Sequence, residues 1–382
     1  MTKAKESGQN TTARIFRTIW SSPRISRIEI AERIGLDKST VTNQVATLIE
    51  LGLVEEMEAG TASARGGRRP IQLGINKSFG RVLGVEIQTE SYVAVLVDLA
   101  GEILAVRRGH IHLTAESFPE TVTRIVSEVS GELGPGPRPL LGVGVGTGGL
   151  VDYDKSLIRY SVPLDITAPL DFGKEVASRL PVPCYVENDA NCCAWGELAF
   201  NKSAELRDFL FALVEYRKEL TSVGSVGGLG VGFGVVLDGK VYSGAHGNAG
   251  EFRSAFCDGR GDLQFALGKD ELSRFASDPE VLRRASEELA RNMAMLVNTM
   301  DFDRVFIGGD IESLDIDFPA ILRRRLEENW MYPFPKGVEI AYSSLGEKAV
   351  AYGAAGMILD RLVTESLLPG LGGQGGAFPR GS

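Results

Sequence analysis

Two short helices separated by a glycine turn place the strongest constraint on the fold of the N-terminal part. Residues 27–34 (RIEIAERI) repeat apolar side chains with helical spacing, and Gly35 follows, where a positive φ can end a helix. Asp37 stands where a capping side chain would begin a second helix over residues 38–51. Another amphipathic stretch, over 11–21, precedes both. The pattern predicts a helix-turn-helix unit with three helices.

The start of the last of these helices is polar on the face opposite its apolar residues. Hydroxyl, amide and ammonium groups placed there can hydrogen-bond to base edges or phosphates in the major groove of DNA. The same residues would also suit the solvated face of an ordinary three-helix bundle, so the periodicity alone leaves both interpretations open. The candidate DNA contacts in this helix are Lys38, Ser39, Thr40, Thr42, Asn43 and Gln44.

A predicted β-hairpin with an arginine-bearing loop favours the DNA-binding interpretation. Residues 53–56 and 71–75 have the composition of two strands, and the glycine-rich loop between them carries Arg65, Arg68 and Arg69. Three guanidinium groups in a tight loop suit contacts to phosphates or to the minor groove. The N-terminal part is therefore predicted to be a winged helix-turn-helix domain.

Composition and charge exclude several classes of protein. With 43% hydrophobic residues and a net charge of −9, the chain is not disordered throughout. No apolar run reaches the roughly 18 residues of a membrane span, the start lacks the apolar core of a signal peptide, and four cysteines without C-x-x-C spacing form no disulfide framework. Residues 1–80 hold 12 Lys or Arg against 8 Asp or Glu, and the rest holds 29 against 42. We expect a cytoplasmic protein with a basic, DNA-binding head on an acidic body and no membrane contact.

From residue 81 onward, predicted strands and glycine turns form a pattern that occurs twice. In each half an antiparallel meander is followed by a helix and a strand that ends in glycines, at 146–149 and at 308–309. The duplication predicts an α/β body of two lobes with a cleft between them. The expected domains are the winged helix at 1–78, a first lobe at 79–200, a second lobe at 201–365 whose last helix returns to the first, and a flexible tail at 366–382.

Several segments, taken in order, resemble the ROK family (repressors, open reading frames, kinases). The resemblance is to the branch of xylose- and N-acetylglucosamine-type repressors that carries an N-terminal winged helix. It implies a two-lobed, actin-like (ribonuclease H-like) fold, assembled as homodimers or homotetramers. The matching motifs are G-R-R-P at 67–70, G-T-G-G-L-V-D at 146–152, V-E-N-D-A-N at 186–191, G-V-G-F-G-V-V-L-D-G-K at 230–240, G-N-A-G-E-F at 247–252 and V-F-I-G-G-D at 305–310.

The resemblance also implies a sugar site around V-E-N-D-A-N. In kinases of the family the aspartate of this motif is the base that acts on a sugar hydroxyl, and its counterpart here is Asp189. From the residues alone, Asp189 could also cap a helix, a role that is compatible with contact to a sugar. Asn188 is a natural companion of Asp189, and Glu251 matches a sugar-contacting glutamate of the family. The candidate sugar-binding residues are Gly148, Asn188, Asp189, His246, Glu251 and Ser254.

The phosphate- and metal-binding parts of the family pattern are degraded. D-x-G-G-T of the first strand is replaced by residues 86–90 (EIQTE), whose last carboxylate would repel a triphosphate, and Leu229 replaces a threonine of the second phosphate loop. Ser254 stands in place of the family's zinc-binding histidine. Of the cysteines that bind the zinc in the family, only Cys257 is present. We predict no cofactor, no metal and no catalytic residue, with Asp189 a vestigial base.

Three functions stay open at this point. The favoured one is a sugar-responsive DNA-binding transcriptional regulator, a repressor of a carbohydrate-utilisation operon, whose partners are operator DNA and a small sugar or sugar derivative. The second is a sugar kinase that retained a DNA-binding head, which Asp189 favours. The third is a ligand-independent DNA-binding protein, which Ser254 favours together with Pro163, a residue that replaces a sugar-contacting asparagine of the family.

Overall fold

The N-terminal head contains three helices and a small antiparallel sheet, as predicted. The computed structural model describes residues 2–22, 24–59, 70–132, 138–201, 206–217, 228–259, 261 and 263–364. Gly35 has a φ of 67° at the end of the second helix, and the Thr40 N–H donates to the Asp37 carboxylate at 2.8 Å, so both local signals are confirmed. The head comprises α1 (Thr2–Ser21), β1 (Ile25–Ser26), α2 (Arg27–Ile34), α3 (Lys38–Glu50), β2 (Val54–Ala59) and β3 (Ile71–Ile75). The first helix begins well before the predicted residue 11, and β1, which pairs with β3, was not predicted.

The first lobe is built on a five-stranded sheet of order β10-β7-β4-β5-β6. The meander β4-β5-β6 is antiparallel, and β7 and β10 extend the sheet in parallel. Apolar residues of α4 and α5 cover one face, where they form a core with β4, β7 and β10. The elements are β4 (Arg81–Ile87), β5 (Ser91–Asp98), β6 (Ile103–His110), α4 (Phe118–Glu132), β7 (Leu140–Thr147), β8 (Leu150–Asp152), β9 (Leu157–Tyr160), α5 (Phe172–Ala177) and β10 (Cys184–Asn188).

The second lobe repeats this plan with a sheet of order β13-β12-β11-β14-β15. Its outer face packs on α8 and α9 through a large apolar core. The elements are β11 (Phe209–Arg217), β12 (Gly228–Leu237), β13 (Lys240–Val241), α7 (Lys269–Leu272), α8 (Pro279–Met300), β14 (Arg304–Gly309), η1 (Asp310–Ser313), α9 (Phe318–Glu328), β15 (Glu339–Tyr342) and η2 (Gly346–Lys348). The duplicated α/β body expected from the sequence is therefore present, while the exact domain limits stay a prediction.

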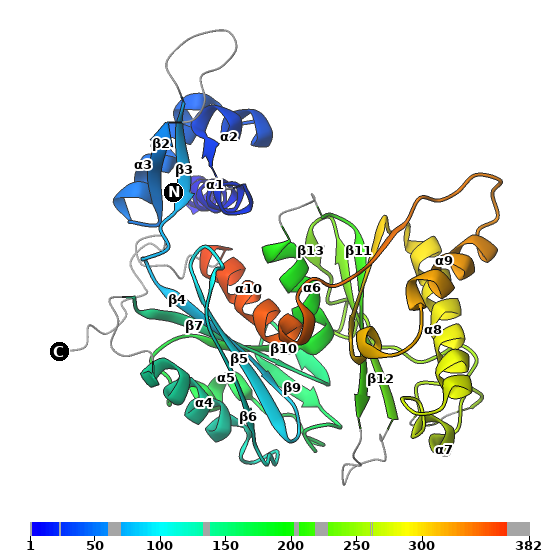
Figure 1. Cartoon of the computed structure of the whole chain (residues 1–382). Coiled ribbons are helices and arrows are strands. Elements are labelled where there is room, and N and C mark those ends of the chain that lie inside the picture. Colours follow the sequence, from blue (N-terminus) through cyan, green and yellow to red (C-terminus); the bar gives the residue numbers. More distant parts are fainter. Residues whose placement is uncertain are drawn as a thin grey trace.

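Two helices, α6 (Asp189–Phe200) and α10 (Ala349–Thr364), fill the space between the sheets (Figure 1). Glycines let the backbones of neighbouring layers pack in direct contact. A Cβ at Gly84 of β4 would lie 1.8 Å from the Ala351 carbonyl oxygen, and one at Gly353 of α10 would lie 1.7 Å from the Cys192 carbonyl oxygen. The order of layers is therefore first sheet, α10, α6 and second sheet.

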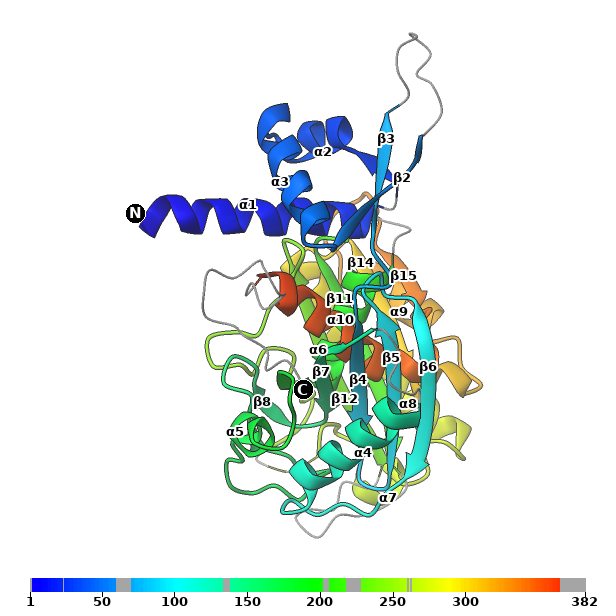
Figure 2. The ribbon, with the colours of Figure 1, turned by 90° about the vertical axis from the view of Figure 1, so that its left-hand side faces the viewer.

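The head lies on the first lobe and shares a core with it (Figure 2). One apolar cluster joins Ile15 and Ile19 of α1 to Leu99 and to Ile358 of α10. The indole N–H of Trp20 donates to the Leu99 carbonyl at 3.1 Å, and Arg17 forms an ion pair with Asp360 of α10. Head and body are thus in direct contact through α1.

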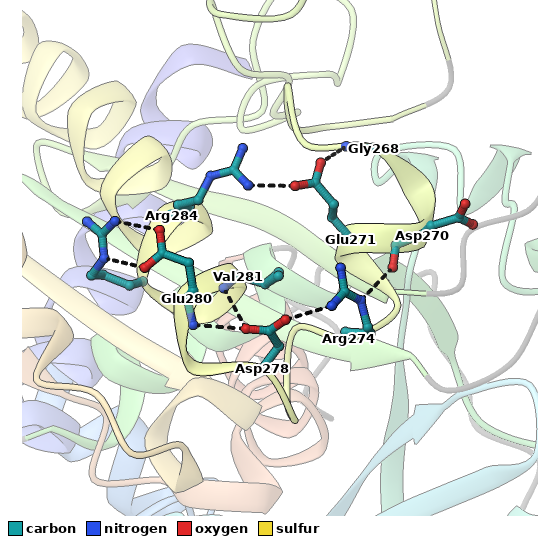
Figure 3. A network of polar contacts seen from close by, with 9 residues as sticks. Gly268, Asp270, Glu271, Arg274, Asp278, Glu280, Val281 and Arg284 are labelled. Atoms are coloured by element: carbon teal, nitrogen blue, oxygen red, sulfur yellow. Dashed lines mark hydrogen bonds and ion pairs between the residues drawn. The ribbon is translucent and has the colours of Figure 1, made fainter.

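A polar network joins α7 to α8 on the outer side of the second lobe (Figure 3). The Asp278 carboxylate caps α8 by accepting from the N–H groups of Glu280 and Val281, and it also pairs with Arg274 at 2.7 Å. Because these side chains are largely exposed, each ion pair contributes about 0–1 kcal/mol to stability. The network orients the start of α8 and lies outside the candidate site.

The helices in the described part of the chain are either short or contain charged residues that break up their apolar stretches. The longest, α8, has 22 residues and carries several arginines and glutamates. The most apolar long helix, α10, has 16 residues. No helix in the described part of the chain is both long and apolar enough to cross a membrane.

Candidate functional site

The outer face of α3 is the candidate DNA-contact surface. Lys38, Ser39, Thr42 and Asn43 are exposed there, whereas the apolar residues on the opposite face of the helix are buried in the head. The Thr42 hydroxyl donates to the Lys38 carbonyl at 2.7 Å. The exposed amide and ammonium groups can still reach a nucleic acid.

Three of the six candidates in α3 form hydrogen bonds with other side chains of the head. The Thr40 hydroxyl donates to Asp37 at 2.6 Å, and hydrogen bonds from Ser39 and Thr40 hold the pKa of the Asp37 carboxyl below its usual range. The half-buried Gln44 accepts a hydrogen bond from the Thr12 hydroxyl of α1. These contacts position the helix within the head. The wing candidates Arg65, Arg68 and Arg69 lie outside the described residues.

Asn188, not Asp189, is the capping residue of α6. Its Oδ1 accepts from the N–H groups of Ala190 at 3.0 Å and Asn191 at 3.2 Å, and its Nδ2 donates to the Gly149 carbonyl at 3.1 Å. The interpretation of Asp189 as the cap is therefore wrong. The Asn188 side chain is committed to the junction between β10 and α6, and Asp189 is the first residue of the helix.

Asp189 and Glu251 both lie next to Gly232 of β12. A Cβ at Gly232 would lie 3.9 Å from Asp189 Oδ1, and Gly232 is bridged to Glu251 in an antiparallel contact. Glu251 keeps an exposed surface, yet the surrounding protein and the charge of Asp189 raise the pKa of its carboxyl to about 7, against the opposing charge of Arg159. We call the place where Asp189, Glu251 and Arg159 meet the interlobe site.

Arg159 reaches the interlobe site from β9 in the first lobe. Its guanidinium donates to the His246 carbonyl and, at 2.6 Å, to Asn248 Oδ1, both on a loop of the second lobe. His246 is an exposed residue. Arg159 contacts its backbone carbonyl and not its imidazole ring. The sequence did not single out Arg159, because an arginine on a short strand has no motif around it.

The remaining sugar candidates, Gly148 and Ser254, form hydrogen bonds within the protein. Ser254 is buried, and its hydroxyl accepts from Asn292 Nδ2 at 3.1 Å and from the Phe256 N–H at 3.2 Å. The Gly148 carbonyl accepts from the Ser161 hydroxyl. A sugar contact by Gly148 or Ser254 stays a prediction.

Gln88 connects the two lobes beside the interlobe site. Its Nε2 donates to Glu86 of β4 at 2.8 Å and to Glu215 of β11 at 3.2 Å. Glu86 is buried, and this burial together with the charges of Glu215, Asp189 and Asp310 raises its pKa to about 8. The turn from β4 to β5 is tight, since the Gln88 N–H donates to the Ser91 carbonyl at 3.0 Å. The contact between Gln88 and Glu215 was not predicted, because it joins strands of the two lobes that only the fold brings together.

Leu229, which replaces a threonine of the family's second phosphate loop, lies in a strand. It is buried in the core of the second lobe and pairs with Tyr216 across β11 and β12. Glycines on either side continue the strand. An apolar side chain directed into the core has no group to donate to a phosphate oxygen.

The raised pKa of Glu86 predicts a pH-dependent stability. The folded protein holds this proton up to about pH 8 and the unfolded chain loses it near pH 4.5, so stability should fall between these values, by up to about 1.4 kcal/mol per pH unit for this group. Glu86→Gln removes the titration and keeps an acceptor for Gln88. We expect a flatter profile of urea midpoints from pH 5.5 to 8.5 than in the wild type. Glu116→Gln, at an exposed position, should leave the slope unchanged. Equal slopes for wild type and Glu86→Gln would contradict the assignment.

The described residues contain no group of three or more His, Cys, Asp or Glu side chains that could hold a metal ion. Cys192 and Cys193 are buried in α6, and burial raises the pKa of both thiols. Neutral, buried thiols act as small apolar side chains in the packing of the helix.

Two family descriptions match the chain in the order of its domains. Residues 9–55 match a winged helix-turn-helix DNA-binding domain, and residues 82–253 match the ROK family. A protein of Caldicellulosiruptor sp. (strain Rt8B.4) is 30% identical over 270 residues, which are 70% of this chain and 64% of the relative. The xylose repressor of Bacillus spizizenii is 27% identical over 270 residues, 70% of this chain and 66% of its own. The chain thus spans slightly less than two thirds of the length of these relatives.

Solved structures show the same fold. A ROK family transcriptional regulator, described as a homologue of the Escherichia coli MLC protein, superposes with a TM-score of 0.72 at 19% identity, over 95% of this chain and 98% of its own. A ROK family glucokinase from Streptomyces griseus superposes with a TM-score of 0.56 at 23% identity, over 73% of this chain and 99% of its own. At these identities the similarity establishes the two-lobed architecture and, for the first structure, a similar arrangement of nearly the whole chain.

Proposed function

Because the chain carries a ROK-family domain behind a winged helix-turn-helix DNA-binding domain, we propose that it is a sugar-responsive transcriptional repressor of a carbohydrate-utilisation operon. The observation that carries this proposal is that the DNA-binding head is in contact with the helix that begins at the interlobe site. Relatives named xylose repressor and N-acetylglucosamine repressor support the choice of a sugar as the effector.

The DNA-binding part of the proposal depends on α3 and the wing. Lys38 and Asn43 are exposed on the outer face of α3, where a recognition helix contacts DNA. Arg65, Arg68 and Arg69 add positive charge in the loop between β2 and β3. In a homodimer or homotetramer, two such heads about 34 Å apart would fit the half-sites of a near-palindromic operator.

The sugar-binding part depends on Asp189 and Glu251. A carboxyl group accepts hydrogen bonds from hydroxyl groups when ionised and can also donate one when protonated, as Glu251 can below about pH 7. Two such groups near Gly232 can hold adjacent hydroxyls of a hexose or pentose. Asn188 supports the site by fixing the start of α6 rather than by contacting the ligand.

Coupling between the two parts follows the axis of α6. The helix starts at Asp189 and ends at Phe200, whose ring stacks on Tyr352 of α10 at 3.7 Å and meets the edge of Trp20 of α1 at 5.9 Å. A ligand that draws Asp189 toward the second lobe would shift the far end of this rigid helix under the head. It can change DNA affinity only by as much as it prefers one arrangement over the other, typically about 1–3 kcal/mol.

Phosphoryl transfer is not part of the proposed function. The Gln88 side chain bridges Glu86 and Glu215 where a kinase of the family has glycine, Leu229 is in the core, and Glu90 adds a negative charge.

The alternative of a ligand-independent DNA-binding protein is favoured by the internal hydrogen bonds of Ser254.

The test is DNA binding with and without sugars. We expect the purified chain to select a specific duplex from a random library and to bind it in a gel shift at about 0.15 M salt, and one sugar of a monosaccharide panel to weaken that binding at least about fivefold. No sequence preference would end the proposal of a transcription factor. Specific binding that no sugar alters would favour the ligand-independent alternative. ADP release from ATP and a sugar would instead establish a kinase.

A further inference from the structure

Two segments from different lobes meet at the loop that carries Glu251. One is the hairpin of β8 and β9 in the first lobe, and the other is the loop at residues 243–251 of the second lobe, which we call the glycine loop. A Cβ at Gly247 would lie 3.2 Å from the Val151 carbonyl oxygen of β8 and 3.2 Å from the Arg159 guanidinium of β9. The backbone of the glycine loop therefore lies directly against the first lobe.

The glycine loop is fixed at one end and weakly bonded in its middle. Near Glu251 it is attached to β12, where the Phe233 N–H donates to the Gly250 carbonyl at 2.9 Å. In the middle, the Gly247 N–H donates to the Gly244 carbonyl at 3.5 Å, which is longer than usual for such a bond. All residues of the loop are exposed or half-buried, and three of its glycines have positive φ values from 67° to 91°. The middle of the loop therefore depends on its contact with the first lobe.

Arg159 makes this contact from a firmly held strand. The preceding residue, Ile158, is completely buried, and it exchanges two backbone hydrogen bonds with Leu170, at 2.8 and 3.0 Å. The Arg159 guanidinium donates to Asn248 Oδ1 at 2.6 Å and to the His246 carbonyl, and we call these two bonds the clasp. Hydrogen bonds from a charged donor are stronger than those between neutral groups. The clasp thus attaches a loop with few bonds of its own to a rigid part of the other lobe.

The surroundings of Glu251 report on the clasp. Burial is the largest cause that raises the pKa of its carboxyl to about 7, the charge of Asp189 raises it further, and the charge of Arg159 opposes both. If the hairpin moved away, the burial would decrease and the pKa would fall toward its ordinary value. If only the positive charge were lost, the pKa would rise instead. The direction of the change therefore distinguishes a movement of the hairpin from a local effect of charge.

We propose that Arg159 is a positioning residue, whose clasp holds the hairpin of β8 and β9 against the glycine loop and keeps the two lobes closed at the edge of the interlobe site. The proposal goes beyond the proposed function, because it concerns the closure of the lobes whatever ligand the site takes. Without the clasp, the hairpin and the middle of the glycine loop can separate, while the packing of α6 on β12 still joins the lobes. Such a contact sets how much of the protein is closed, and a ligand can then shift this population.

Hydrogen–deuterium exchange of the full chain tests the clasp without any ligand. We expect Arg159→Gln to speed exchange in the peptide over residues 243–251 at least about fivefold, because the charged hydrogen bonds that hold the loop are lost. Asn248→Ala keeps the guanidinium and one of its two bonds, and should act in the same direction with a smaller effect. The control Arg124→Gln removes an exposed arginine of α4, whose partner is Glu128, and should leave this peptide unchanged. Wild-type exchange of the peptide in Arg159→Gln would overturn the proposal.

The titration of Glu251 separates positioning from a local charge effect. Carbon-13 NMR of the glutamate-labelled chain, with the signal assigned through Glu251→Gln, follows this carboxyl from about pH 4 to about pH 9. We expect Arg159→Gln to weaken proton binding by Glu251 at least about threefold, because the carboxyl loses its burial. Unchanged or tighter proton binding would contradict the proposal. If thermal unfolding shows that Arg159→Gln is not folded, Asn248→Ala decides both measurements by the same criteria. The absence of any bound sugar would count against the proposed function and not against the clasp.

Discussion

Trp20→Ala should leave DNA binding and sugar binding in place but remove the effect of one on the other. The indole contacts the end of α6 through Phe200 and donates to the Leu99 carbonyl, so it joins the head to the helix that starts at Asp189. Without it, we expect the sugar-induced change in operator affinity to fall from at least about fivefold to less than about twofold. Gel shifts with a sugar titration measure this ratio, and calorimetry of sugar binding checks that the interlobe site is intact.

The matched control is Trp20→Phe, which keeps an aromatic ring but removes the N–H donor. It should retain part of the coupling, because the edge contact with Phe200 remains. Trp20→Ala is also expected to lose about 2 kcal/mol of stability, since the side chain is only partly buried, and thermal unfolding should show that the variant is folded at 25 °C. An unchanged sugar response in Trp20→Ala would show that the head is coupled through another contact.

Gly353→Ala should destabilise the whole body. The added Cβ would lie 1.7 Å from the Cys192 carbonyl oxygen and 2.5 Å from its carbonyl carbon, both in the backbone of α6, so the two central helices must separate. We expect a loss of about 3 kcal/mol or more, measured as a lower urea midpoint and a melting temperature reduced by several degrees. The separation would also disturb the contact of Phe200 with Tyr352, and with it the contact between Phe200 and Trp20 of the head.

Gly131→Ala is the control for this substitution. Gly131 lies in α4, its φ is negative, and in the described part of the chain no atom beyond its neighbours and its own helix backbone lies within 4 Å of the added Cβ. Alanine in a helix is more favourable than glycine by up to about 1 kcal/mol, so this variant should be as stable as the wild type or slightly more stable. Wild-type stability of Gly353→Ala would mean that the helices α6 and α10 are not packed as closely as the structure has them.

Local chemistry made the head predictable. Gly35 ends α2 because glycine adopts a positive φ without strain, and Asp37 begins α3 because its carboxylate accepts an otherwise unpaired N–H. Both signals act within four residues. The short strand β1 was missed because it exists only through pairing with β3, 46 positions or more along the chain at Gln72 and Leu73.

The candidate site was predictable only in part. Asp189 and Glu251 were found by resemblance to a motif, and the structure places both beside Gly232. Whether Asn188 or Asp189 caps α6 depends on a difference of one residue in where β10 ends. The apolar periodicity of the sequence does not locate the end of a strand to one residue. The bond from Gln88 to Glu215 joins residues 127 positions apart, and no sequence pattern couples them.

The order of residues alone determined most of the elements, their duplication and the types of side chain available, because capping, turn formation and apolar periodicity act over a few neighbouring residues. The tertiary structure decided which of these side chains face one another. The glycine contacts between sheets and helices set the layers, the layers bring carboxylates of both lobes together, and α1 joins the head to α6. Such long-range contacts depend on how complete elements pack, which is a property of the folded chain as a whole.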